Sequence, residues 1–159
     1  VPEERKKVIK EELEEIREQY RALNRLFFDK SYPKGALIEK YTAFINLNPK
    51  YYAAYRDRAI LYTHIGKYRE AVADNQLLIT HNERVWSDAI FNKAEALFFL
   101  KDYDGALKVA NHYFAICEKP TAECYRIRAE IFRMLKMSDE YKTDMREYKR
   151  LRKGKKNKI

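Results

Sequence analysis

Glycine and proline are scarce in this chain: four of each occur in 159 residues. An all-β sandwich or barrel needs turn residues every ~8–12 positions, so this supply excludes a fold built from many short strands. Hydrophobic residues make up 46% of the chain and aromatic residues 14%, which is enough to bury a core and excludes a disordered chain. The length is that of one domain.

Residues that commonly carry chemistry are also few, with two cysteines and three histidines. Cys117 and Cys124 have no second pair nearby, which argues against a zinc site and a disulfide framework and predicts free, mostly buried thiols. The sequence contains no Gly-rich phosphate loop and no G-x-S-x-G nucleophile motif. The histidines share no helix face. We therefore predict a non-enzymatic protein that uses no metal and no cofactor.

Targeting signals are missing from the sequence as given. No apolar run approaches the ~18 residues of a membrane span. The N-terminal VPEERKKVIKEELEEI lacks the apolar segment of a secretory signal. Free thiols fit a reducing compartment, so we expect the cytoplasm. The chain begins with Val1 rather than Met, which leaves open a targeting segment upstream.

The net charge of +9 is concentrated at the C-terminal end of the chain. Residues 142–159 hold nine basic and two acidic residues, whereas the other 141 residues are nearly neutral. Such an end attracts phosphates by counterion release, which makes RNA or an anionic membrane surface one candidate partner. A merely solvated terminal helix is the alternative. The candidate residues of this basic tail are Lys149, Arg150, Arg152, Lys153, Lys155 and Lys156.

The sequence repeats itself at an offset of 35 residues. One aligned column holds the small residues Ala59, Ala94 and Ala129, and the position before each alanine is always basic. Large apolar residues recur three positions after the alanine and again three positions later. The repeat defines four units, after which a basic tail covers 154–159. The units are 17–51, 52–86, 87–121 and 122–153.

Each unit is predicted to be a hairpin of two helices. Apolar residues in the first half of a unit recur at intervals of three and four, which is the period of an amphipathic helix. A short polar turn such as Gly66-Lys67 or Lys101-Asp102 follows, and a second apolar period begins after it. Four such hairpins give about eight helices. Serines stand at three expected helix starts: Ser31, Ser87 and Ser138.

These residues resemble tetratricopeptide (TPR) repeats. The segment AYRDRAILYTHIGKYREAVADNQLLI (54–79) is the closest match, and 87–117 with AEALFFLKDYDGAL is nearly as good. The resemblance covers about 85% of the chain, with the first unit the most degenerate. It implies an all-α fold: an α-solenoid of about four stacked helix-turn-helix hairpins in a right-handed superhelix, with an extended N-terminal helix.

Tyrosine is abundant, with 13 in the chain, and we expect most of these rings to fill the joints between helices. The basic column also has a structural interpretation. Arg58 and Arg128 are each followed 16 residues later by an aspartate, so we predict Arg58–Asp74 and Arg128–Asp144 ion pairs within hairpins. The residue 16 positions after Lys93 is Val109, so we expect no ion pair in that hairpin.

In TPR proteins the first helix of each hairpin lines a concave face that binds proteins or peptides, and the resemblance implies the same here. A chaperone-type clamp for two carboxylates is excluded, because Glu123 stands where that clamp has a lysine. We expect a groove of carboxylates, arginines and phenylalanines that suits a basic and aromatic peptide or helix; a solvated inner face is the alternative. Its candidate residues are Arg56, Asp57, Ile60, Asp88, Phe91, Asn92, Glu95, Phe99, Glu123, Arg126 and Glu130.

Residues 1–16 precede the first hairpin and are predicted to extend its first helix. Apolar residues from Ile9 to Phe27 recur at alternating intervals of four and three, as in a coiled coil. The part from Val8 to Ile16 has no partner helix within a hairpin. It must pack on the rest of the chain or in trans, and a homodimer through this helix is one expectation.

Overall fold

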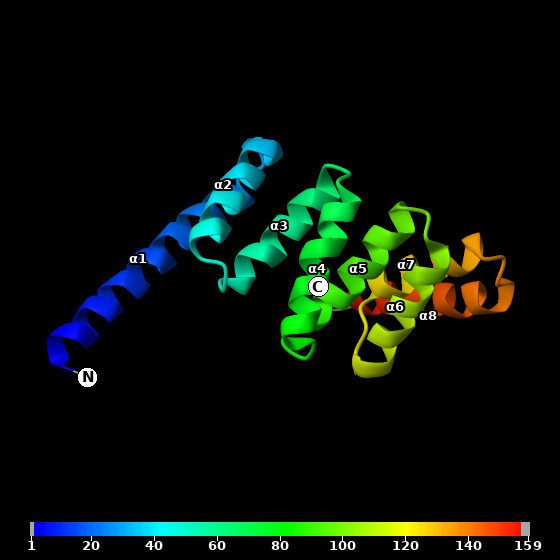
Figure 1. The fold of residues 1–159 in the computed structure, drawn as a ribbon. Helices are drawn as coiled ribbons and strands as arrows, with labels where there is room; N and C mark the ends of the chain where they lie inside the picture. Colours follow the sequence, from blue (N-terminus) through cyan, green and yellow to red (C-terminus); the bar gives the residue numbers. More distant parts are fainter. Residues whose placement is uncertain (1, 157–159) are drawn as a thin grey trace. The chain divides into compact units, whose positions relative to one another are not determined.

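The computed structural model describes residues 2–156, with side chains for 2–154, and helices account for 82% of it. No strand occurs in this part of the chain, which confirms an all-α fold (Figure 1). Packing is mainly between helices adjacent in the sequence. The helices are α1 (Glu3–Phe28), α2 (Lys34–Leu47), α3 (Tyr52–His64), α4 (Tyr68–Asn82), α5 (Ser87–Phe99), α6 (Tyr103–Ile116), α7 (Ala122–Met134) and α8 (Ser138–Lys156).

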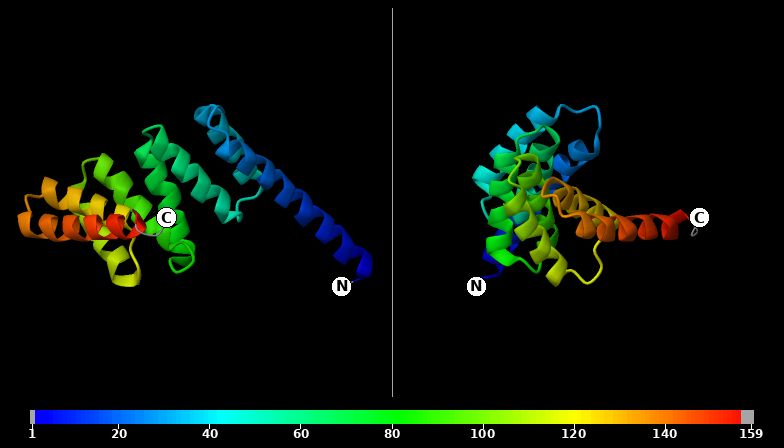
Figure 2. Two further views of the ribbon diagram at one scale, coloured as in Figure 1. Left: turned by 180° about the vertical axis from the view of Figure 1, so that it is seen from behind. Right: turned by 90° about the vertical axis from the view of Figure 1, so that its right-hand side faces the viewer.

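The helices form two compact units, which are described separately: Val1–Ile65 with α1 to α3, and Gly66–Ile159 with α4 to α8. In the first unit α1 runs unbroken through the predicted boundary at residue 16. Its N-terminal half extends beyond α2 (Figures 1 and 2). The side chains of Val8, Ile9 and Leu13 are about half exposed there. None of the helices in residues 2–156 is both long and apolar enough to cross a membrane.

The turn between α1 and α2 corrects one expected helix start. Ser31 does not begin α2, because its backbone N–H and hydroxyl both bond to the Asp29 carboxylate, at 2.9 and 2.6 Å. Pro33 follows, and its fixed φ of −62° leads into a helix that begins at Lys34. Ser87 and Ser138 are the first residues of α5 and α8, as predicted.

The turns inside the hairpins show the repeat in the backbone itself. Gly66, Lys101 and Lys136 are spaced by 35 residues, and all three have positive φ, at 77°, 64° and 60°. After α5 the N–H of Lys101 bonds to the Phe98 carbonyl and that of Asp102 to the Leu97 carbonyl. The turn after α7 repeats both bonds. This pattern is the Schellman motif, which needs a left-handed residue after the helix.

The alanine column is buried, as close helix packing requires. Ala59, Ala94 and Ala129 are at most 1% exposed. In the second unit aromatic rings fill the space around the alanines: Tyr113 packs at 5.2 Å from Phe91, measured between ring centroids. The core of this unit therefore runs continuously along α5, α6 and α7.

The predicted ion pair between Arg128 and Asp144 is confirmed. The arginine Nε and a terminal guanidinium nitrogen lie 2.7 and 2.8 Å from the two carboxylate oxygens. At the equivalent place Lys93 bonds to the neutral Gln76 amide oxygen at 2.6 Å, which agrees with the missing acid. Arg58 donates to the Thr42 hydroxyl at 3.0 Å; its pairing with Asp74 would join the two units and stays a prediction.

Candidate binding surfaces

In the first unit, the structure places Asp57 inside the packing of three helices rather than on an open face. Its side chain is only 4% exposed. One carboxylate oxygen accepts the hydroxyls of Tyr20 and Tyr41, at 2.6 and 3.2 Å. The other accepts two N–H groups of Arg56, at 3.0 and 2.8 Å. This buried cluster joins α1, α2 and α3.

The hydrogen-bonding capacity of Asp57 is therefore already used within the fold. Burial, followed by the bond to Asp57, raises the pKa of Tyr20 to about 12. Burial also raises the pKa of Tyr41 strongly, and the negative charge of Asp57 adds to the effect. The expectation that Asp57 lines a binding groove is corrected to a structural role, and Arg56 is held beside it. Ile60 is partly exposed.

The second unit holds all the remaining predicted groove residues on α5 and α7, and these two helices contact each other directly. Phe91 lies on α5 but is not accessible to a partner, since it is only 8% exposed and packs in the core against Tyr113. It cannot contact a partner without unpacking that core. Asp88 is exposed, and Asn92 is partly exposed on the same helix.

The acidic side chains on α7 are paired with arginines one turn away. Both oxygens of Glu123 accept the Nε–H of Arg126, at 3.0 Å each. Glu130 accepts from Arg133 at 2.8 Å in the same way. The hydrogen bond from Arg126 lowers the pKa of Glu123. The two ion pairs leave neither carboxylate free.

Glu95 on α5 differs from its acidic neighbours. Its side chain is partly buried, and it forms no ion pair or hydrogen bond with the part of the chain that the structure describes. Burial raises its pKa, and the nearby charge of Glu123 raises it further, whereas Arg126 partly offsets both. Glu95 is thus a desolvated carboxylate without a cation of its own.

An apolar surface lies one helical turn beyond Glu95. Phe99 is 44% exposed and stacks on Tyr68, with ring centroids 4.9 Å apart. Residues four apart on a helix share a face, so Glu95 and Phe99 are neighbours on the surface of α5. A carboxylate beside an exposed aromatic ring is an arrangement that can receive a cationic and an apolar side chain together.

The C-terminal part of α8 carries cations without acidic partners among the described side chains. Lys149, Arg152 and Lys153 line a hollow of about 350 Å³ together with Tyr148, whose hydroxyl accepts from Arg152 at 3.0 Å. Arg150 is instead paired with Glu147 at 2.8 Å. The side chains of Lys155 and Lys156 lie outside the described residues.

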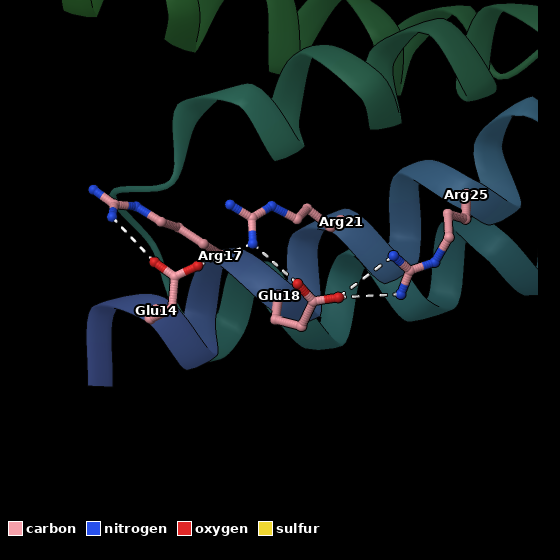
Figure 3. A network of polar contacts seen from close by, with 5 residues as sticks. All are labelled: Glu14, Arg17, Glu18, Arg21 and Arg25. Carbon is pink, nitrogen blue, oxygen red and sulfur yellow. Dashed lines mark hydrogen bonds and ion pairs between the residues drawn. The ribbon is translucent and has the colours of Figure 1, made fainter. Parts of the chain in front are cut away.

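The surface of α1 carries a ladder of exposed ion pairs (Figure 3). Glu14 contacts Arg17 and Arg21, at 3.4 and 2.9 Å. Glu18 contacts Arg21 and Arg25, at 3.0 and 3.3 Å. Hydrogen bonds from these arginines lower the pKa of both glutamates. The ladder supports an exposed helix and offers no site, because all members are solvated and internally paired.

The sequence did not point to a groove of about 530 Å³ between α4, α5 and α6. Its walls include Ile79, Leu97 and Val109, with Lys93 at its edge. The only sequence signal was Val109 at a position where the second and fourth units have aspartate.

Within the described residues, no three His, Cys, Asp or Glu side chains are placed to hold a metal ion. Cys117 and Cys124 are both free thiols, and Cys124 is buried. Comparison of the chain with models of known protein families gave no match, and comparison with curated proteins gave none either.

Proposed function

We propose that the chain is a non-enzymatic interaction module that binds a basic peptide or helix on the α5–α7 surface. In this proposal the hairpins stack as a TPR-like, right-handed solenoid, which the 35-residue spacing of the left-handed turn residues supports. The binding surface is not a clamp for a partner carboxylate, since Glu123 is anionic and already bonded to Arg126.

The observation that carries the proposal is the carboxylate of Glu95, which is partly buried and forms no ion pair or hydrogen bond within the described structure. A charge that is held away from water without an ion-pair partner costs free energy in the unbound protein. A lysine or arginine of a partner would supply the missing charge. An adjacent apolar side chain of the same partner would cover Phe99, which is exposed beside it.

The proposal is tested with two fluorescein-labelled peptides of nine residues that differ only in charge, one with three lysines and one with three glutamates among leucines. Fluorescence anisotropy should show binding of the lysine peptide alone. Glu95→Gln and Phe99→Ala should each weaken it by about tenfold. The control is Glu70→Gln, which removes an exposed carboxylate from α4. Equal affinity of the wild type and Glu95→Gln would contradict the proposal.

A second candidate function is binding of RNA or an anionic membrane surface through α8. The hollow lined by Lys149, Arg152 and Lys153 supports it, because these cations have no acidic partner among the described side chains. Binding of labelled poly(U) or of phosphatidylserine vesicles should fall steeply with salt and disappear on truncation after Tyr148. Lysine-peptide binding on α5 should survive that truncation.

A further inference from the structure

The side chain of Arg128 lies between α6, α7 and α8, in a position called here the Arg128 seat and formed by Phe114, Asn111 and Asp144. Its guanidinium carbon lies 3.5 Å from the centroid of the Phe114 ring, a close cation–π contact. The same group bonds to both oxygens of Asp144 and, at 3.4 Å, to the Asn111 side chain. The arginine thereby contacts the second helices of two successive hairpins, α6 and α8.

One repeat earlier, the position equivalent to the Arg128 seat is formed by different residues. Subtracting 35 from each residue number replaces Arg128 by Lys93 and Asp144 by Val109. Phe114 and Asn111 become Ile79 and Gln76. The shorter cation turns to Gln76, and the groove of about 530 Å³ at this place is larger than the hollow of about 340 Å³ that Arg128, Phe132 and Asp144 line one repeat later.

The groove combines an apolar interior with cations at its edge. Its apolar lining is Val72, Ile79, Ile90, Leu97 and Val109. Lys93 and Lys108 are also among its lining residues, and neither forms an ion pair with the described residues. The charge at this edge therefore complements an anion, while the interior suits an aliphatic chain.

Both ends of the groove are occupied by polar side chains that already have partners. At one end His112 contacts Glu83 at 3.0 Å. At the other end Asp102 accepts the N–H of Gly105 at 3.0 Å and caps α6. The stretch of α4 from Val72 to Ile79 covers about 10 Å at ~1.5 Å per residue. The space is thus short and bounded at both ends. It can hold a small ligand, whereas an extended polypeptide would need a longer, open groove.

We propose that this groove binds a medium-chain aliphatic carboxylate, with the chain among Ile79, Leu97 and Val109 and the carboxylate on Lys93. The aliphatic chain of the ligand would take the place that the Phe114 ring has one repeat later, and its carboxylate the place of Asp144. Binding exchanges the bond from Lys93 to the neutral Gln76 oxygen for a bond to an anionic carboxylate, which adds the attraction of an ion pair. This site is separate from the peptide surface around Glu95.

The test is isothermal titration calorimetry of the full chain with decanoate and with 1-decanol. The wild type should bind decanoate at one saturable site. The double variant Lys93→Arg with Val109→Asp rebuilds the seat of Arg128 and Asp144, so it should fold and lose decanoate binding by at least tenfold. Val109→Phe fills the groove from α6 while keeping Lys93, and it should have the same effect.

The charged contact is tested separately by Lys93→Gln, which should weaken decanoate and leave 1-decanol unchanged. Lys119→Gln, in the exposed segment before α7, is the matched control. Glu95→Gln should leave decanoate binding intact, so failure of the peptide proposal and failure of this one are distinguishable. Absence of saturable binding to the wild type, or equal binding to the wild type and both groove-filling variants, would overturn the proposal.

Discussion

Arg128 and Asp144 join the two helices of the last hairpin through two hydrogen bonds of 2.7 and 2.8 Å. The side chain of Asp144 is 4% exposed and that of Arg128 is 17% exposed, so the pair is largely shielded from water. Removing one member of such a pair leaves the other charge buried without compensation, which is more costly than losing an exposed ion pair.

Asp144→Ala should therefore lower the free energy of unfolding by about 3 kcal/mol, measured by urea denaturation. Glu147→Ala, which breaks the exposed pair with Arg150, should cost less than about 1 kcal/mol. A double-mutant cycle with Arg128→Met isolates the interaction. A cycle showing no coupling between residues 128 and 144 would contradict the assignment.

Lys101 and Lys136 carry the left-handed conformation that Gly66 adopts without a side chain. A lysine at positive φ costs about 1 kcal/mol relative to glycine, because its Cβ crowds the following carbonyl. Lys101→Gly and Lys136→Gly should each raise the free energy of unfolding by about 0.5–1 kcal/mol, as measured by chemical denaturation. Lys108→Gly, inside α6, should do the opposite. Destabilisation by both turn glycines would refute this account of the turns.

The cluster around Asp57 should make the protein sensitive to alkali. The pKa of Tyr20 in the fold is about 12, above the ordinary tyrosine value of 10.0, so the unfolded chain loses this proton first. The stabilising contribution is complete below pH 10 and is lost as pH rises toward 12. Tyr20→Phe should make the fall in stability between pH 10 and pH 12 smaller. The measurement is thermal unfolding at a series of pH values. An unchanged pH profile would show that Tyr20 does not titrate differently in the folded state.

Glu95 should show the destabilising signature of a partly buried carboxylate that forms no ion pair. Its pKa in the fold is raised above the ordinary glutamate value of 4.5, so the unfolded chain ionises first and gains stability relative to the fold as pH rises above 4.5. Glu95→Gln should leave stability near pH 4 unchanged and increase it at pH 7, as measured by denaturation at both values. Asp88→Asn, an exposed acid on the same helix, is the control. Lower stability of Glu95→Gln at pH 7 would mean that the carboxylate has a partner in the free protein.

The periodicity of the sequence predicted the helices well because hairpin packing is local. Alanines at 59, 94 and 129 mark close helix contacts, and the spacing of Arg128 and Asp144 gave their pairing. The left-handed turns were not visible, since lysine at 101 and 136 lacks the signature that glycine gives at 66.

Which predicted groove residues stay accessible could not be obtained from the pattern. Asp57 lies at a position that resembles a groove position, but Tyr20 and Tyr41 reach it from the two preceding helices, α1 and α2. Phe91 likewise packs on Tyr113, from the neighbouring helix. Such contacts depend on side-chain packing between helices, whereas the repeat reports only the period of each helix.

The central claim is that the α5–α7 surface, with Glu95 and Phe99, is the binding site. The most direct measurement is chemical-shift mapping of the ¹⁵N-labelled chain during titration with the lysine peptide. The account predicts that the largest shifts lie on α5 and α7 around Glu95, Phe99 and Arg126. Shifts confined to α8 beyond Tyr148, or to the N-terminal half of α1, would contradict it.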